Sequence, residues 1–150
     1  MTTDLQAGCV PGTTHHSHAR CIVCGWANPL GLRLAFRLQP DGRVEATFGG
    51  NGICEGYPNR LHGGVISLLL DGAMTNCLFA HQCTAVTAKM EVKFRYPVKA
   101  RVPAIVRAWI EKAYPPLYRM KAELEQEGQT KATASALFME QPELDEEKAS

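Results

Sequence analysis

The chain has almost no excess of charge of either sign, because 16 lysines and arginines balance 15 aspartates and glutamates, for a formal net charge of +1. This balance gives no strong field that would favour nucleic acid or an anionic membrane as a partner. Residues 1–20 lack the apolar core of a secretory signal. The apolar stretch around Asp71 is too short and too polar at its ends to span a bilayer. We therefore expect a cytoplasmic protein with neither a nucleic-acid nor a membrane partner.

An internal repeat and an interdomain linker are also absent, and 150 residues suit a single domain. Residues 1–20 are polar and residues 141–150 are acidic, so both are expected to be flexible arms on a folded domain of residues 21–140. Six cysteines would suggest disulfides in a small secreted protein. Without an export signal, free thiols in a reducing compartment are favoured here.

Alternation of apolar and polar residues predicts six strands, each with one apolar face. They are expected at residues 32–38, 44–48, 86–96, 102–110, 118–124 and 132–138. Asp41-Gly42 and Glu127-Gly128 are typical hairpin turns between neighbouring strands. In the strand over 86–96, Thr87 is expected on the polar face with Lys89.

A single helix is predicted from about residue 63 to residue 80, and it is apolar almost all round. The element order β-β-α-β-β-β-β then predicts an α+β fold, in which one curved antiparallel six-stranded sheet wraps around a central buried helix. The free edges of such a sheet are best closed by a second copy of the chain. We therefore expect a homo-oligomer, either a dimer or a tetramer built as a pair of dimers.

The start of this helix carries the sequence His62-Gly63-Gly64. Two glycines let another molecule approach the backbone, and the free N–H groups of a helix start can bind a polarised oxygen. His62 is interpreted as a residue that fixes this turn, because no acidic partner that would make it a base lies near it in the sequence.

A polar stripe of Ser67, Asp71 and Thr75, spaced four residues apart, interrupts the apolar helix. The stripe either faces water or a neighbouring element, or it faces a cleft at a subunit interface. A carboxylate in a buried helix is unfavourable unless it is paired, neutralised or used. An oxygen-binding helix start and an acid on the same helix are the parts of a small acyl-transfer site.

Several of these segments resemble one family. Residues 61–65 followed by residues 69–73 resemble the signature of hotdog-fold acyl-CoA thioesterases, in the branch that includes phenylacetyl-CoA and human thioesterase-superfamily enzymes. Asp71 lies nine positions after His62 within the expected element order, which makes the motif more specific than His-Gly-Gly alone. Further similar segments are residues 21–32, 55–60, 86–88 and 94–98, so the resemblance covers about residues 21–140.

The resemblance implies hydrolysis of an acyl-CoA thioester to a carboxylic acid and CoA, without a metal or cofactor, at a site shared by two subunits. By this resemblance the Gly64 N–H polarises the carbonyl, Asp71 of the facing subunit acts as general base or nucleophile, and Thr87 positions water. Substrate contacts are expected from Tyr57, Asn59, Gly63, Ser67 and Thr75.

The chain departs from its relatives just before the helix. Some relatives carry an asparagine six residues before the histidine, where this chain has Gly56, and Glu55 stands at a usual glutamine position. This leaves the polar contact beside the thioester unassigned.

Two other functions are possible for a chain with these motifs. One is a non-catalytic module that binds acyl-CoA, but a pure binder gains nothing from a buried acid such as Asp71. The other is a hotdog hydratase or dehydratase, which would need an acid and a histidine in another spacing. The acyl group depends on a pocket length expected to be set by Tyr57, Leu68, Met74 and Leu78.

Cys21-x-x-Cys24 has the spacing of half a zinc site, and Cys9, His15, His16 and His18 could supply further ligands. We expect no metal, because a tetrahedral site needs four ligands from an ordered segment. A thioredoxin-like redox role is disfavoured, since a strand rather than a helix follows the motif. The remaining cysteines, Cys54, Cys77 and Cys83, are expected to be small core residues.

Overall fold

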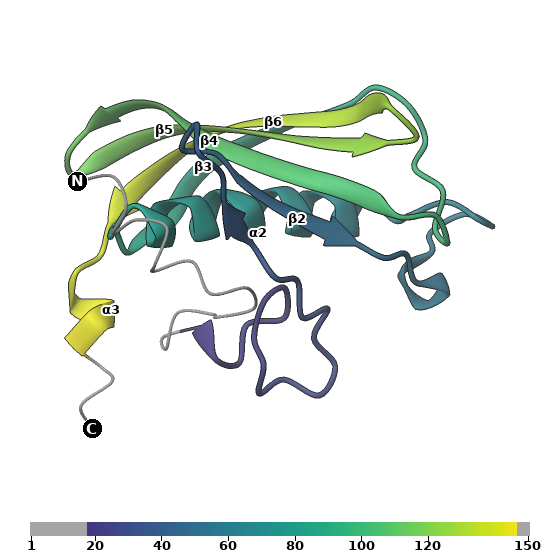
Figure 1. Ribbon diagram of the computed structural model, residues 1–150, viewed down its shortest axis with the longest axis horizontal. Coiled ribbons are helices and arrows are strands. Elements are labelled where there is room, and N and C mark those ends of the chain that lie inside the picture. Colours follow the sequence, from purple (N-terminus) through teal and green to yellow (C-terminus); the bar gives the residue numbers. More distant parts are fainter. Residues whose placement is uncertain (1–17, 147–150) are drawn as a thin grey trace.

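The computed structural model of the chain describes residues 18–146, in which six strands form one antiparallel sheet in the order β1-β2-β4-β5-β6-β3 (Figure 1). The strands are β1 Arg37–Leu38, β2 Val44–Phe48, β3 Ala85–Phe94, β4 Ala104–Tyr114, β5 Leu117–Gln126 and β6 Gln129–Glu140. The helices are α2 Gly63–Ala80 and the one-turn α3 Glu143–Glu146, and a 3-10 turn spans Gly52–Cys54. The predicted fold and the predicted bounds of the central helix are confirmed.

The sheet curves over α2, and the core lies between the two (Figure 1). Alternate residues of the central strands point toward the helix, as their sequence pattern predicts. These buried residues are Val44, Ala46, Phe48, Ala104, Val106, Ala108, Met120, Ala122, Leu124, Ala132, Ala134, Ala136 and Phe138. Leu69, Leu70, Met74 and Leu78 of α2 meet them and are fully buried.

By length and composition alone, α2 could cross a membrane, so the expectation that this stretch is too short and too polar at its ends is wrong. Ten of its 18 residues are buried in this fold, so the core accounts for its apolar character. The helix is not enclosed on every side, however. Val65, Leu68 and Asp71 are partly exposed and Gly64 is exposed, so the expectation of a helix buried all round is wrong for the single chain.

The first strand is much shorter than predicted, because only Arg37–Leu38 pair in the sheet. Upstream, the N–H groups of Leu32 and Leu34 donate to the carbonyls of Ile22 and Val23, at 2.7 Å and 2.9 Å. Leu34 is still buried, and Leu32 packs against the core. The apolar alternation therefore predicted burial correctly, but hydrogen bonds to the N-terminal loop replace those of the sheet.

Strand β3 lies at one edge of the sheet and pairs with β6 alone. Its register shifts at Ala88. Thr87 lies opposite Phe138 and Met90 lies opposite Ala136, so three residues of β3 pair with two residues of β6. Such a β-bulge reverses which face the following residues occupy. Thr87 consequently faces α2, and the prediction that it shares the polar face with Lys89 is wrong.

Of the two predicted arms, residues 1–17 and 147–150 lie outside the described part of the chain, whereas residues 18–20 and 141–146 are described. From His18 onward the chain packs against α2. The His18 and Phe79 rings are in edge-to-face contact, with their centroids 4.8 Å apart. The described part of the C-terminal segment forms α3.

The burial of α2 under the sheet gives a direct test of the core. We expect Leu69→Ala to lower the free energy of unfolding by about 2–5 kcal/mol, because Leu69 is fully buried and the change leaves a cavity. Leu30→Ala is the matched control: that side chain is 85% exposed, so the change should stay within about 0.5 kcal/mol. Urea unfolding measures both, and equal effects would contradict this packing.

Candidate active site

The start of α2 is held by a side-chain cap. His62 precedes the helix in an extended conformation, and its Nδ1 accepts a hydrogen bond from the Gly64 N–H at 2.8 Å. The His62 carbonyl accepts from the N–H groups of Val65 and Ile66 at 2.9 Å and 3.0 Å. This arrangement satisfies the first donors of the helix and fixes the turn.

The cap changes the assignment of the free donor at this helix start. The Gly64 N–H, expected to polarise a carbonyl, is already bonded to His62. Within residues 18–146, no hydrogen-bond partner is recorded for the Gly63 N–H, and Gly63 lines a pocket. The free donor is therefore one residue earlier than the sequence indicated, because the capping contact of an imidazole could not be read from the motif.

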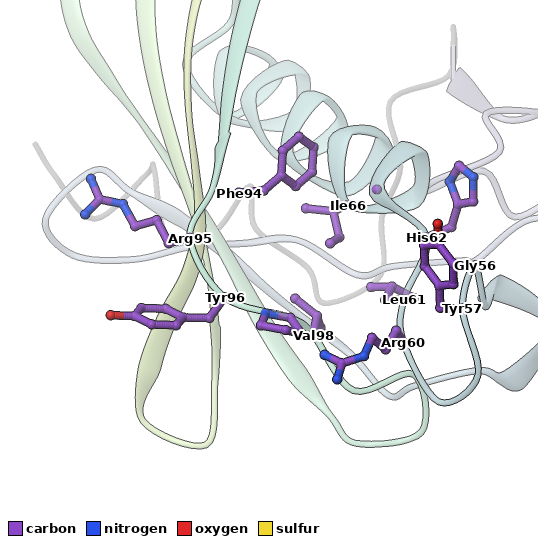
Figure 2. Close-up of a pocket in the computed structure, with 12 residues that line it drawn as sticks. Gly56, Tyr57, Arg60, Leu61, His62, Ile66, Phe94, Arg95, Tyr96 and Val98 are labelled. Atoms are coloured by element: carbon purple, nitrogen blue, oxygen red, sulfur yellow. The ribbon is translucent and has the colours of Figure 1, made fainter.

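The pocket beside Gly63 has a volume of about 710 Å³. It lies between the loop before α2 and the segment that follows β3, as Figure 2 shows. Its walls are mostly apolar, and it is lined by Gly56, Tyr57, Arg60, Leu61, His62, Gly63, Ile66, Phe94, Arg95, Tyr96, Pro97 and Val98. It is the size of a small-molecule site.

The rim of this pocket exposes large aromatic side chains. Tyr57 is 81% exposed, Phe94 is 55% exposed and Tyr96 is 51% exposed. A cluster of exposed apolar surface of this kind is typical of a binding or subunit-contact region. Arg60 and Arg95 add two positive charges, and no ion pair of either is recorded in the described range.

Asp71 lies outside this pocket, two turns further along α2. Its Oδ1 accepts a hydrogen bond from the Thr87 hydroxyl at 2.5 Å. The β3 bulge thus brings together the two residues that the resemblance assigned to the acid and to water positioning. Both belong to the same chain.

The distance along the helix separates Asp71 from the free donor. Gly63 and Asp71 are eight residues apart, which is about 12 Å along the axis of an α-helix. A hydrogen bond spans only about 3 Å. One small acyl group therefore cannot contact both the Gly63 N–H and the Asp71 carboxylate of a single chain.

The other predicted contacts divide into two groups. Tyr57 lines the pocket with His62 and Gly63. In contrast, the hydroxyls of Ser67 and Thr75 donate to carbonyls one turn back in α2, at 3.0 Å and 3.1 Å, and neither residue lines the pocket. Such bonds are common for these residues inside helices.

Asn59 is also placed away from the pocket. It adopts a positive φ of 58° in the loop, and its N–H donates to the Glu55 carboxylate at 3.2 Å. Glu55 also accepts from Arg101 at 2.5 Å. Glu55, which stands where relatives usually have glutamine, thus stabilises the loop that carries Tyr57 through its contacts with Asn59 and Arg101.

The prediction of which residues set the length of the acyl pocket is partly wrong. Met74 and Leu78 are fully buried in the core between α2 and the sheet, so they do not line the pocket. The sequence missed Phe94 and Tyr96 as lining residues. The sequence does show that large apolar side chains continue to the end of β3 and beyond it. Whether these side chains are exposed depends on where the strand leaves the sheet, which the sequence does not show.

A second cluster of reactive side chains lies apart from the pocket. One ligand atom each from His18, Cys21 and Cys24 falls within 4.8 Å of the others, a grouping that could hold a metal ion. The hydrogen bond between the two thiols lowers the pKa of Cys21, and this bond together with burial raises the pKa of Cys24. The other ligands that the sequence offered, Cys9, His15 and His16, lie outside the described residues.

The remaining cysteines are free thiols. Cys77 and Cys83 are buried as predicted, whereas Cys54 is only partly buried. Burial raises the pKa of Cys77 to about 12, so this thiol is not a nucleophile at neutral pH.

Comparison with known proteins identifies the family to which the chain is similar. Residues 59–133, which contain both the helix start and Asp71, match the family model of the thioesterase superfamily. The chain is also 25% identical over 97 residues to Acyl-coenzyme A thioesterase THEM4 of Bos taurus. That alignment covers 64% of this chain and 40% of THEM4, so the chain spans about two fifths of that relative.

Solved structures show the same fold. A crystal structure of a thioesterase superfamily protein superimposes with a TM-score of 0.76 at 21% identity, over 81% of this chain and 60% of that one. A hypothetical thioesterase from Streptococcus pneumoniae TIGR4, solved with coenzyme A, gives a TM-score of 0.67 at 15% identity, over 71% of this chain and 87% of that one. The predicted hotdog architecture is confirmed by these matches.

The cap at the helix start generates a prediction about stability. His62→Ala removes the acceptor of the Gly64 N–H and should lower the free energy of unfolding by about 0.5–2 kcal/mol. His62→Asn should restore most of this loss, because an asparagine side chain also caps helices well. Urea unfolding of the two variants decides the matter: if they are equally unstable, capping is not the contribution of His62.

Proposed function

Because the chain belongs to the thioesterase superfamily, as its motifs predicted, we propose that it hydrolyses an acyl-CoA to a carboxylic acid and free CoA. The observation that carries the proposal is the pair of groups on α2: a free N–H at Gly63 and a carboxylate at Asp71 held by Thr87. The name of THEM4 as an acyl-coenzyme A thioesterase and the coenzyme A in the streptococcal structure support this substrate class. Arg60 and Arg95 at the pocket rim suit the phosphates of CoA.

The proposed reaction needs two chains. Since one chain holds its donor and its acid about 12 Å apart, we infer that Gly63 of one subunit acts with Asp71 of a second. Strand β3 supports this arrangement, because it is a ten-residue edge strand whose outer side is unpaired in the described chain. Such an edge is suited to pairing with another copy.

We propose a register for this pairing from the positions of two residues along β3. Thr87, near one end of the strand, contacts Asp71, and the Phe94 ring at the other end lies 3.6 Å from where a Cβ of Gly63 would be. Antiparallel pairing about a two-fold axis near Met90 and Glu91 sets Thr87 of one chain opposite Phe94 of the other. Each Asp71 then approaches the partner's helix start.

In the proposed mechanism, the Gly63 N–H and the positive end of the α2 dipole polarise the thioester carbonyl oxygen. Thr87 donates to one oxygen of Asp71, which leaves the other oxygen to take a proton from water. The water oxygen bonds to the carbonyl carbon, the C–S bond breaks, and the CoA sulfur leaves and takes up the proton. Direct attack by the carboxylate is the alternative path for the same residue.

The first test of this function is a thiol-release assay across short, medium, long and aromatic acyl-CoAs. Asp71→Asn should reduce turnover by at least about a hundredfold, because the variant keeps the shape of the side chain but loses the base. Thr87→Ala should reduce turnover less, since it removes a positioning contact. Asp41→Asn and Thr47→Ala, which are exposed residues away from the site, are the matched controls.

A folded Asp71→Asn variant with near-full activity would remove Asp71 from the mechanism. A wild-type protein that binds these acyl-CoAs and releases no thiol from any of them would instead identify a non-catalytic acyl-CoA-binding module.

Subunit exchange tests the shared site. Gly63→Pro removes the proposed donor and fits the first position of a helix, and the extended conformation of His62 suits a residue before proline. Mixed with Asp71→Asn, it gives hybrid dimers in which one site carries both defects and the other carries none. Activity should return toward about one quarter of wild type for random mixing of a symmetric pair.

Each variant alone is the control, and mass spectrometry reports whether the subunits exchange. If hybrids form, both variants are folded and no activity returns, then donor and acid act within one chain and the shared site is wrong.

A further inference from the structure

The His18–Cys21–Cys24 cluster lies in the N-terminal loop, on the side of α2 that faces away from the sheet (Figure 1). The distance between His18 Nδ1 and Cys24 Sγ is 3.7 Å. In a tetrahedral zinc site with Zn–S bonds of about 2.3 Å, neighbouring ligand atoms are about 3.5–3.8 Å apart. This contact is a hydrogen bond between the Cys24 thiol and the His18 ring, and its length also matches the spacing of two ligands on one ion.

The backbone of residues 21–25 has the shape that presents two cysteines to one ion. The Val23 N–H points at Cys21 Sγ at 3.4 Å, and the Gly25 N–H donates to the Cys21 carbonyl at 2.8 Å. A Cβ at Gly25 would lie 2.4 Å from the Cys21 nitrogen, so only glycine permits this tight return of the chain. N–H groups directed at sulfur are the usual outer contacts of a metal-bound thiolate.

The loop that carries the cluster packs against α2, which keeps the three ligand atoms within 4.8 Å of one another, so an ion needs only a small further approach of the side chains. A Cβ at Gly72 would lie 2.6 Å from Val23 Cγ1, which shows how closely the loop sits on the helix. Cys24 is 3% exposed, and the His18 ring is oriented by its edge-to-face contact with Phe79. The ordered segment that a metal site requires, and that the sequence alone could not supply, is present for three ligands.

We propose that His18, Cys21 and Cys24 bind one structural zinc ion that fastens the N-terminal loop to the back of α2. Two thiols and one imidazole form a soft donor set that favours zinc over magnesium or calcium. The fourth position is filled by water. The proposal replaces the expectation, made from the sequence, that no metal is bound.

The ion is assigned a structural role because its ligands lie outside the pocket that contains Gly63. Gly72, on which the loop packs through Val23, directly follows Asp71 in α2. Loss of the ion is therefore expected to lower the melting temperature, by freeing the loop from the helix. The proposal does not depend on the thioesterase reaction.

Metal analysis of the purified full chain tests the proposal. Protein from zinc-supplemented cultures, freed of loose ions by gel filtration, should contain about one zinc per chain. Cys21→Ser and His18→Ala should each lose most of this zinc. Cys54→Ser and His81→Ala are the matched controls and should retain it, because neither residue belongs to the cluster.

Cobalt substitution gives a second measurement on the wild-type chain, which remains informative if a variant fails to fold. Cobalt(II) in the site should show thiolate-to-metal charge transfer and the strong visible bands of tetrahedral coordination. Addition of excess zinc should remove this spectrum, and chelation should lower the melting temperature.

Three results would overturn the proposal. In the first, the reduced wild-type chain contains no stoichiometric zinc and gives no cobalt spectrum. In the second, zinc is present but is lost equally from Cys54→Ser, which places the ion elsewhere. In the third, the isolated protein is lighter by two hydrogens through a Cys21–Cys24 disulfide and still binds no metal after reduction, which identifies a redox thiol pair instead.

Discussion

The length of helix between Gly63 and Asp71 is the constraint on which the rest of the site depends. An α-helix is a rigid spacer, and eight residues place the free N–H and the carboxylate about 12 Å apart. No side-chain rotation closes that gap, because the N–H belongs to the backbone. A reaction that uses both groups on one thioester therefore requires a second helix, and we propose that the β3 edge, unpaired within residues 18–146, supplies it by pairing with another copy.

The fold makes this spacer rigid and points its two groups in defined directions. Leu69, Leu70, Met74 and Leu78 fix α2 under the sheet, so the helix cannot shift to bring donor and acid together. The His62 cap uses the Gly64 N–H, and the Gly63 N–H has no partner among residues 18–146. At the other group, the bulge in β3 turns the Thr87 hydroxyl toward Asp71.

The sequence predicted the fold well because the fold is recorded in local patterns. Alternating residues such as Val106 and Ala108 indicate which face is buried, and the all-apolar stretch from Gly63 to Ala80 has the right length for the central helix. The prediction of the first strand was wrong in its length, because the backbones of Leu32 and Leu34 form hydrogen bonds with the N-terminal loop instead of the sheet. An alternating pattern does not show which backbone a segment pairs with.

The site was predicted less well, for physical reasons that differ by residue. Asp71 and Thr87 were found through family resemblance, but the bulge that joins them reverses the face of Thr87 and leaves no local signal. The free donor moved from Gly64 to Gly63 because a side-chain cap depends on the rotamer of His62. Met74 was expected to border the acyl group but is buried in the core against the sheet. The periodicity of a sequence predicts that a side chain is buried, but it does not identify the element that covers it.

The central claim is that donor and acid come from different chains. The most direct measurement is a crystal structure with an acyl-CoA analogue in which a methylene group replaces the thioester sulfur. The account predicts that the carbonyl oxygen lies about 3 Å from the Gly63 N–H of one subunit. It also predicts that the carbonyl carbon faces the Asp71 carboxylate of the other. An acyl group bound beside Asp71 with the Gly63 N–H of neither chain in contact would contradict it.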